Sequence, residues 1–144
     1  MSQLTQILQN LVNQDDKTKI ELAVHSYLEL ESTFKVLDPE TEGMGIIYAI
    51  LGTTVVADGK LTEGEYGMIE GILSAKGLSS DREAVLGLVN LAANRKQDAY
   101  NIVRAVRERL NDEGTADLLN FIAAICAIDD TISKEEIELI ESLL

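Results

Sequence analysis

The strongest constraint on the fold is an internal repeat between the middle and the end of the chain. The segment VVADGKLTEGEYGMIEGIL (55–73) aligns without gaps with CAIDDTISKEEIELIESLL (126–144), 71 residues further on. Each copy has an apolar stretch, then a turn with aspartate, then a helix with regular apolar spacing. We therefore predict a duplicated helical hairpin, with repeat units at about 44–76 and 115–144. The two copies could pack about a pseudo-twofold axis.

Composition favours an all-α fold. The chain has 144 residues, one proline and 4% aromatic residues, and it is 46% hydrophobic. This length suits a single domain, residues 1–144, with its own core. Apolar periodicity and helix breakers predict seven or eight helices. Their expected ranges are about 3–12, 17–37, 42–57, 63–76, 80–94, 96–111, 114–128 and 134–144.

The turn in the first copy, ADGKLTEGE (57–65), matches the second half of a calcium-binding loop. The Asp-Gly, aliphatic and glutamate positions of an EF-hand loop fall on Asp58, Gly59, Leu61 and Glu65. The first half does not match, because Thr54 and Val56 are poor ligands for a hard cation. The motif is therefore either a metal site with fewer ligands or a well-formed turn into a helix.

A purely structural interpretation accounts for much of this motif. Thr62-x-x-Glu65 and Ser133-x-x-Glu136 both read as capping boxes, in which side chains bond the first backbone N–H groups of a helix. Asp58 and Asp129 would then stabilise the preceding turn. Ser80-x-x-Glu83 predicts a third capping box without an Asp-Gly pair before it.

A metal-binding interpretation rests on where the glutamates fall. Glu65 and Glu136 lie on the apolar faces of their helices, and a buried carboxylate needs a partner. Duplication could bring Asp58, Glu65, Asp129 and Glu136 together, and a divalent cation would relieve their mutual repulsion. Oxygen ligands favour calcium, magnesium or manganese over zinc. We predict these four residues as metal ligands and predict no other cofactor.

An apolar helix, then A-D-G-x-L-T-x-x-E, then an amphipathic helix resembles the TerB family, which is named for tellurite resistance. The repeated motif covers 38 residues, and the helical layout fits most of the chain. The resemblance implies an all-α, non-enzymatic protein of the stress response whose acidic residues bind metal. The second copy departs from the pattern, with Asp130 in place of glycine, and aspartate tolerates positive φ less readily.

Charge and the cysteine count limit the partners and the compartment. A net charge of −13 opposes nucleic-acid binding and favours cations and basic partners. One cysteine allows no internal disulfide, and no basic signal-peptide region opens the chain, so we expect a cytoplasmic protein. The apolar runs 44–57 and 118–128 are too short to cross a bilayer. We expect protein partners, and homo-oligomerisation stays open.

Two further patterns have alternative explanations. Five basic residues lie between positions 95 and 109: Arg95, Lys96, Arg104, Arg107 and Arg109. They either complement a helix dipole or form a basic stripe that docks an acidic partner. Gly64, Gly67 and Gly71 share one side of a helix and permit close approach by another helix, within the fold or from a partner.

No catalytic set is present in the sequence. His25 is the only histidine and has no partner at ligand spacing, and Cys126 lies in an apolar run typical of a core. We therefore predict a protein that is not an enzyme. Two function classes remain: a cation-responsive, TerB-like stress protein that acts through partners, and a small helical interaction module whose acidic motif is purely structural.

Overall fold

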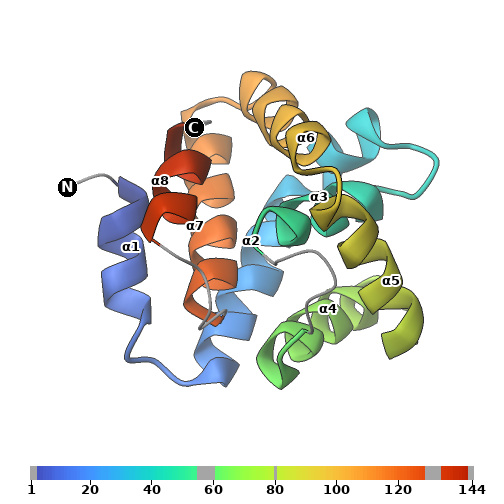
Figure 1. Cartoon of the computed structure of the whole chain (residues 1–144), viewed down its shortest axis with the longest axis horizontal. Coiled ribbons are helices and arrows are strands. Elements are labelled where there is room, and N and C mark those ends of the chain that lie inside the picture. The colour runs from blue at the N-terminus through green and yellow to red at the C-terminus, as the bar shows by residue number, and fades with distance from the viewer. Residues whose placement is uncertain (1–2, 55–60, 80, 129–133, 143–144) are drawn as a thin grey trace.

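The computed structural model describes residues 3–54, 61–79, 81–128 and 134–142. Over these ranges the chain forms eight helices and no strand, in one compact domain (Figure 1). The helices are α1 (Gln3–Leu11), α2 (Asp16–Leu37), α3 (Met44–Thr54), α4 (Glu63–Ala75), α5 (Arg82–Ala93), α6 (Lys96–Glu108), α7 (Asp112–Ile128) and α8 (Lys134–Ser142). The predicted all-α class is confirmed.

The helices form two neighbouring groups (Figure 1). In the first group, α2 packs against both α7 and α4, and α1 packs against α7. In the second group, α3 packs against α5 and α6. The core lies where the groups meet, because α3 also contacts α7.

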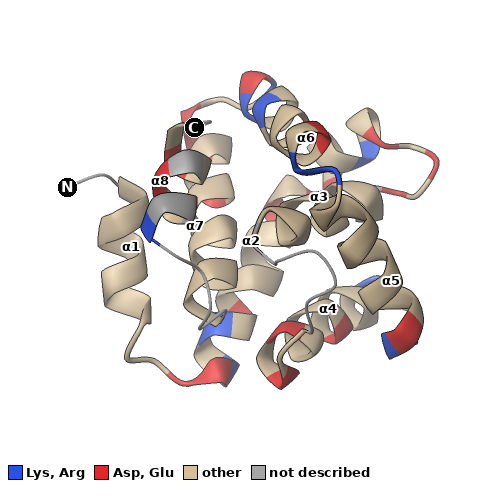
Figure 2. Ribbon diagram, in the orientation of Figure 1, with Lys and Arg blue, Asp and Glu red and all other residues tan. Residues whose placement is uncertain are grey.

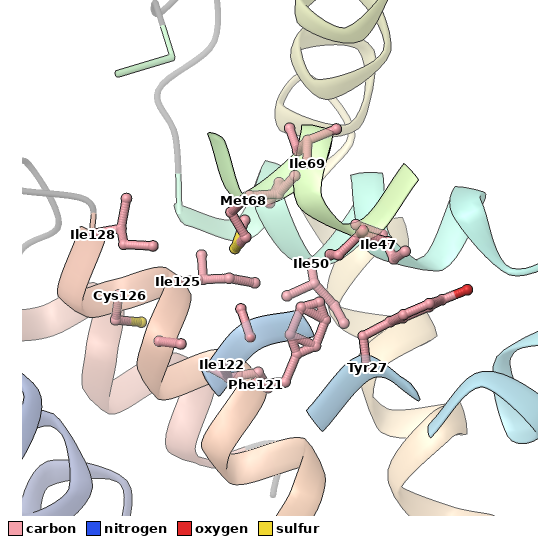
Figure 3. Packing of buried hydrophobic residues seen from close by; sticks show 14 of the residues in the cluster. Tyr27, Ile47, Ile50, Met68, Ile69, Phe121, Ile122, Ile125, Cys126 and Ile128 are labelled. Carbon is pink, nitrogen blue, oxygen red and sulfur yellow. The ribbon is translucent and has the colours of Figure 1, made fainter. Parts of the chain in front are cut away.

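Helix α7 is the centre of the core. Every residue from Phe121 to Ile128 is buried, so this helix is covered on all sides over its last two turns. Figure 3 shows its side chains, among them Phe121 and Ile125, beside Ile50 of α3 and Met68 of α4. Burial of each large apolar side chain contributes about 1.5–3 kcal/mol, which makes α7 a main source of stability.

Local backbone geometry corrects the predicted start of α3. The helix begins at Met44, not at residue 42, because Glu42 and Gly43 have φ angles of 53° and 86°. Residues in this left-handed region cannot belong to a right-handed helix. The predicted end of the second helix at residue 37 is confirmed, since α2 ends at Leu37.

The ends of α4 and α5 show which of the predicted caps form. Gly77 follows α4 with φ +74°, as expected of the residue after a C-cap. The expected start of α5 at Ser80 is wrong: the helix begins at Arg82, and the Asp81 side chain accepts from the Glu83 N–H at 3.0 Å. Ser80 itself lies outside the described residues.

Each repeat unit contributes two helices, α3 with α4 and α7 with α8. The contacts run crosswise, because α3 touches α8 and α4 touches α7. A pseudo-twofold axis would give this arrangement, and the duplication itself stays a prediction. Among the helices described, none is long and apolar enough to span a membrane.

Candidate functional site

Glu65 is the predicted metal ligand whose side chain the structure describes. It lies in the first turn of α4 and is only 1% exposed, although glutamate is an ionisable residue that usually lies at the surface. Asp58 and Asp129 lie outside the described residues. Glu136 belongs to α8, but its side chain is outside the described part as well.

Thr62 and Glu65 form the predicted capping box. The extended backbone of Thr62 lets its hydroxyl oxygen accept from the Glu65 N–H at 3.1 Å. Glu65 Oε1 accepts from the Thr62 N–H at 2.9 Å. The structural role of Glu65 is therefore confirmed. Capping uses Oε1 as an acceptor, and a carboxylate carries two acceptor oxygens.

The start of α4 lies against the end of α7 and the start of α2. A Cβ at Gly64 would lie 2.9 Å from Ile128 Cγ2 and 3.2 Å from Asp16 Oδ2. The structure thus packs the end of α7 against the start of α4. In the sequence, α7 precedes the second copy of the acidic motif, and α4 follows Asp58 of the first copy. The Asp16 carboxylate also faces the N-terminus of α4, where a negative charge is favourable.

Lys19 places a positive charge at the same end of α7. Its side chain is 7% exposed, and its ammonium donates to the Ala127 carbonyl oxygen at 3.2 Å. The last carbonyls of a helix have no intrahelical partner and carry partial negative charge, so this cation stabilises the C-terminus of α7.

Sequence reasoning missed Asp16 and Lys19, although both left a signal. Lys19 lies four residues before the buried Ala23, on the apolar face of α2. Asp16, Ile20 and Val24 follow one another at steps of four, and the glycines of α4 face this line. A Cβ at Gly67 would lie 3.0 Å from Ile20, and one at Gly71 would lie 3.1 Å from Val24. The glycine strip thus packs within the fold.

The exposed acidic side of α4 is held by an arginine of α5. Arg82 donates from Nη1 to Glu63 at 2.8 Å and from Nε to Glu70 at 3.1 Å. Its guanidinium also lies over the Tyr66 ring, 4.7 Å from the centroid. Hydrogen bonding to Glu63 and Glu70 raises the pKa of Arg82. Glu63 and Glu70 are therefore engaged away from the buried Glu65.

The remaining chemistry-bearing residues fit structural roles. Cys126 is buried in the core, as predicted. His25 is exposed on α2. Within the described ranges, no group of three or more His, Cys, Asp or Glu residues is arranged to hold a metal ion. Two carboxylates lie near the start of α4, those of Glu65 and of Asp16 from α2. Carboxylate oxygens are ligands that hard divalent cations prefer.

Fold and site together define a small acidic all-helical domain with a buried glutamate in a capping box. The model of the family of tellurite resistance protein TerB matches residues 46–144, which include both copies of the motif. The match covers more than half of the chain, and the protein therefore belongs to the TerB family. Comparison with curated proteins and with solved structures gave no match.

Proposed function

We propose that this TerB-family protein binds a divalent cation through its acidic turns and acts in the stress response through protein partners, without enzymatic activity. Family membership supports an association with tellurite resistance. We propose a cytoplasmic location, because a chain with a single cysteine suits a reducing compartment.

The observation that carries the proposal is the buried carboxylate of Glu65 in the first turn of α4, a turn that packs against the end of α7. Gly64 approaches Ile128 closely, so the helix entering the second acidic turn ends next to the first turn of α4. A carboxylate that is 1% exposed is costly unless hydrogen bonds or a cation stabilise it. The proposed ligands are Asp58, Glu65, Asp129 and Glu136.

Oxygen donors determine which ion this set would select. Carboxylates suit calcium, magnesium and manganese, whereas zinc sites use histidine and cysteine more often. Lys19 contributes one positive charge at the same end of α7, and its donation to Ala127 anchors that end in place. A bound divalent cation would add positive charge and so reduce the repulsion among the carboxylates of the acidic turns.

Thermal unfolding of the protein stripped with EDTA tests the proposal. A cation present at a hundred times its Kd adds about 2.7 kcal/mol, which corresponds to about 5–10 °C in Tm for a domain of this size. We expect such a shift with calcium, magnesium or manganese, and we expect it to vanish in the double variant Asp58→Asn, Asp129→Asn. The matched control is Asp81→Asn, which changes an acidic helix cap outside the motif and should keep the shift. No shift with any ion would contradict cation binding.

The alternative is a small helical interaction module in which the motif is purely structural. The reciprocal hydrogen bonds of Thr62 and Glu65 favour this alternative, because they give the buried glutamate a structural task. In that case cations would leave Tm unchanged, and function would lie on the outer surface of the helices.

A further inference from the structure

An apolar groove runs over the face where α3, α5 and α6 meet. One hollow of about 350 Å³ lies between the three helices, and a second of about 360 Å³ continues between α3, α6 and the end of α2. Gly45 and Ile102 line both hollows, so they form one continuous groove. A separate, smaller hollow of about 230 Å³ lies beside Val36 of α2 and Arg109, the residue that follows the last turn of α6.

The groove exposes large apolar side chains along its length. Leu88 and Leu91 of α5 line one end of the groove and are 44% and 53% exposed. Val36 of α2 is 66% exposed in the separate hollow, next in sequence to Leu37, which lines the other end of the groove. These are three of the six large apolar residues found exposed in the described part of the chain. Exposed apolar residues collected in one groove mark an interaction site more often than scattered ones do.

Helix α6 carries an arginine at each end of this groove. Arg95 is its N-cap and Arg109 its C-cap. Together with Asp98, Ile102 and Ala105 they recur at steps of three and four, which places them on one helix face. Figure 2 shows basic residues at the connection from α5 to α6 and along α6.

Arg95 occupies a position that is unfavourable for the helix itself. The N-terminus of a helix carries partial positive charge, and its N-cap is usually a side chain that accepts a hydrogen bond. Arg95 makes no side-chain cap bond, and Lys96 adds a second positive charge next to it. Neither Arg95 nor Arg109 pairs with a carboxylate among the residues described. Arg95 is therefore the cation that an acidic partner would meet first, whereas Arg109 also lines a hollow that contains Glu29, Glu113 and Asp117.

We propose that this groove binds an acidic amphipathic helix of a partner protein. The fourteen steps from Arg95 to Arg109 span about 21 Å along α6, the length of a helix of about fourteen residues. The apolar side of that helix would enter the hollows at Ile102, and its acidic residues would meet the arginines. This is a helix-in-groove arrangement with anchors at helical spacing.

Two features of the groove disfavour other occupants. A symmetric contact between two copies of the chain would bring the basic ends of α6 toward each other. A basic partner would find few carboxylates in the lining. The acidic residues there are Asp98 and Asp38, and the Asp38 carboxylate already accepts hydrogen bonds from the Gly45 N–H and the Thr41 hydroxyl. The proposal names the kind of partner that the proposed function invokes, but it does not depend on cation binding.

Binding of three synthetic 16-residue peptides, followed by fluorescence anisotropy, tests the proposal. The first peptide is an amphipathic helix with leucine on one face and glutamate on the other. The second has lysine in place of glutamate, and the third scrambles the first so that the apolar face is lost. We expect the acidic helix to bind at least tenfold more tightly than either control peptide, and added salt to weaken that binding.

Substitutions in the protein locate the site. Leu88→Gln with Leu91→Gln should weaken binding at least tenfold, as should Arg95→Glu with Arg109→Glu. Val12→Gln with Leu28→Gln is the matched control, because these residues are 57% and 48% exposed away from the groove. Circular dichroism of each variant checks that the fold is retained.

The proposal is overturned if no peptide binds, if the lysine or scrambled peptide binds as tightly, or if the control substitutions weaken binding as much. Two further measurements address the other occupants. Phosphatidylserine vesicles that bind through the same leucines, while the acidic peptide does not, would replace the partner helix with an anionic membrane. Self-association that Leu88→Gln with Leu91→Gln abolishes, again without peptide binding, would replace it with a second copy. Chelation with EDTA should leave peptide binding unchanged, which separates this result from the cation test.

Discussion

Thr62 and Glu65 each accept a hydrogen bond from the other's backbone N–H group, at 3.1 and 2.9 Å. This reciprocal pair fixes the start of α4 and holds a glutamate that is almost fully buried. The same carboxylate is the centre of the proposed cation site. Its structural and cation-binding roles can be separated, because capping needs only an acceptor oxygen whereas cation binding benefits from the negative charge.

Two substitutions separate these roles. Glu65→Gln retains an acceptor that suits a capping box, so most of the stability should remain while the cation-induced rise in Tm is lost. Thr62→Ala removes the cap and should cost about 1 kcal/mol, but it leaves the carboxylate and the rise in Tm. Denaturant unfolding measures the loss of stability, and thermal unfolding with and without calcium, magnesium or manganese measures the rise in Tm. Equal rises in Tm for Glu65→Gln and the parent would mean that this carboxylate does not bind the ion.

Close packing of α4 on α2 predicts opposite effects at two glycines. A Cβ at Gly71 would lie 3.1 Å from Val24 Cγ2, and the β-branched side chain of Val24 has little freedom to move. Gly71→Gln should therefore destabilise the protein by about 1–2 kcal/mol. Gly87 of α5 has no neighbour within 4 Å, so Gly87→Gln should be neutral or stabilise by up to about 1 kcal/mol. Urea unfolding of both variants decides the matter, and a stable Gly71 variant would refute the tight contact.

Lys76 joins three parts of the chain at the other end of α4. Its ammonium donates to the Tyr27 hydroxyl at 2.8 Å and to the Glu42 carbonyl oxygen at 2.7 Å. Burial raises the pKa of the Tyr27 hydroxyl, with a further contribution from the charge of Glu31, so this group stays neutral at pH 7.

Loss of the Lys76 ammonium should therefore be felt in stability. We expect Lys76→Met to cost about 1–2 kcal/mol in the free energy of unfolding. The control is Lys35→Met, which removes an exposed ion pair with Glu31 and should cost less than about 0.5 kcal/mol. Equal losses in the two variants, measured by chemical unfolding, would show that Lys76 does not tie these parts together.

Apolar periodicity predicted the helices well because burial of one face is what stabilises them. The spacing in the sequence located α2 and α4 to within a residue or two of their observed ends. The errors arose where backbone geometry decides. Glu42 and Gly43 adopt positive φ before α3, and Asp81 caps α5 in place of the expected Ser80. A single residue in such a turn leaves no periodic signal.

The candidate site was predicted in part. The spacing of Glu65 from Thr62 predicted the capping box, and the position of Glu65 on the apolar face of its helix predicted its burial. Lys19 and Asp16 were missed because they reach this site from α2, more than forty residues away along the chain. The groove was missed for the same reason. Helix α6 displays its amphipathic pattern in the sequence, but its neighbours α3 and α5 are identified only by the tertiary contacts.

The N-terminus of α2 predicts a dependence of stability on pH. The Asp15 carboxylate accepts from the Thr18 N–H at 2.8 Å, and this bonding to Thr18 lowers the pKa of Asp15 below its usual value. A lowered folded-state pKa means that the carboxylate stabilises the protein above its unfolded pKa and that this contribution is lost as pH falls through the folded pKa. Asp15→Asn keeps an N-cap acceptor but cannot titrate. The parent should therefore be more stable than this variant at pH 7, and in denaturant unfolding the gap should narrow as pH falls below the unfolded pKa of Asp15 and close as pH falls through its lowered folded pKa. A gap that stays constant over this range would show that the charge of Asp15 contributes nothing to the cap.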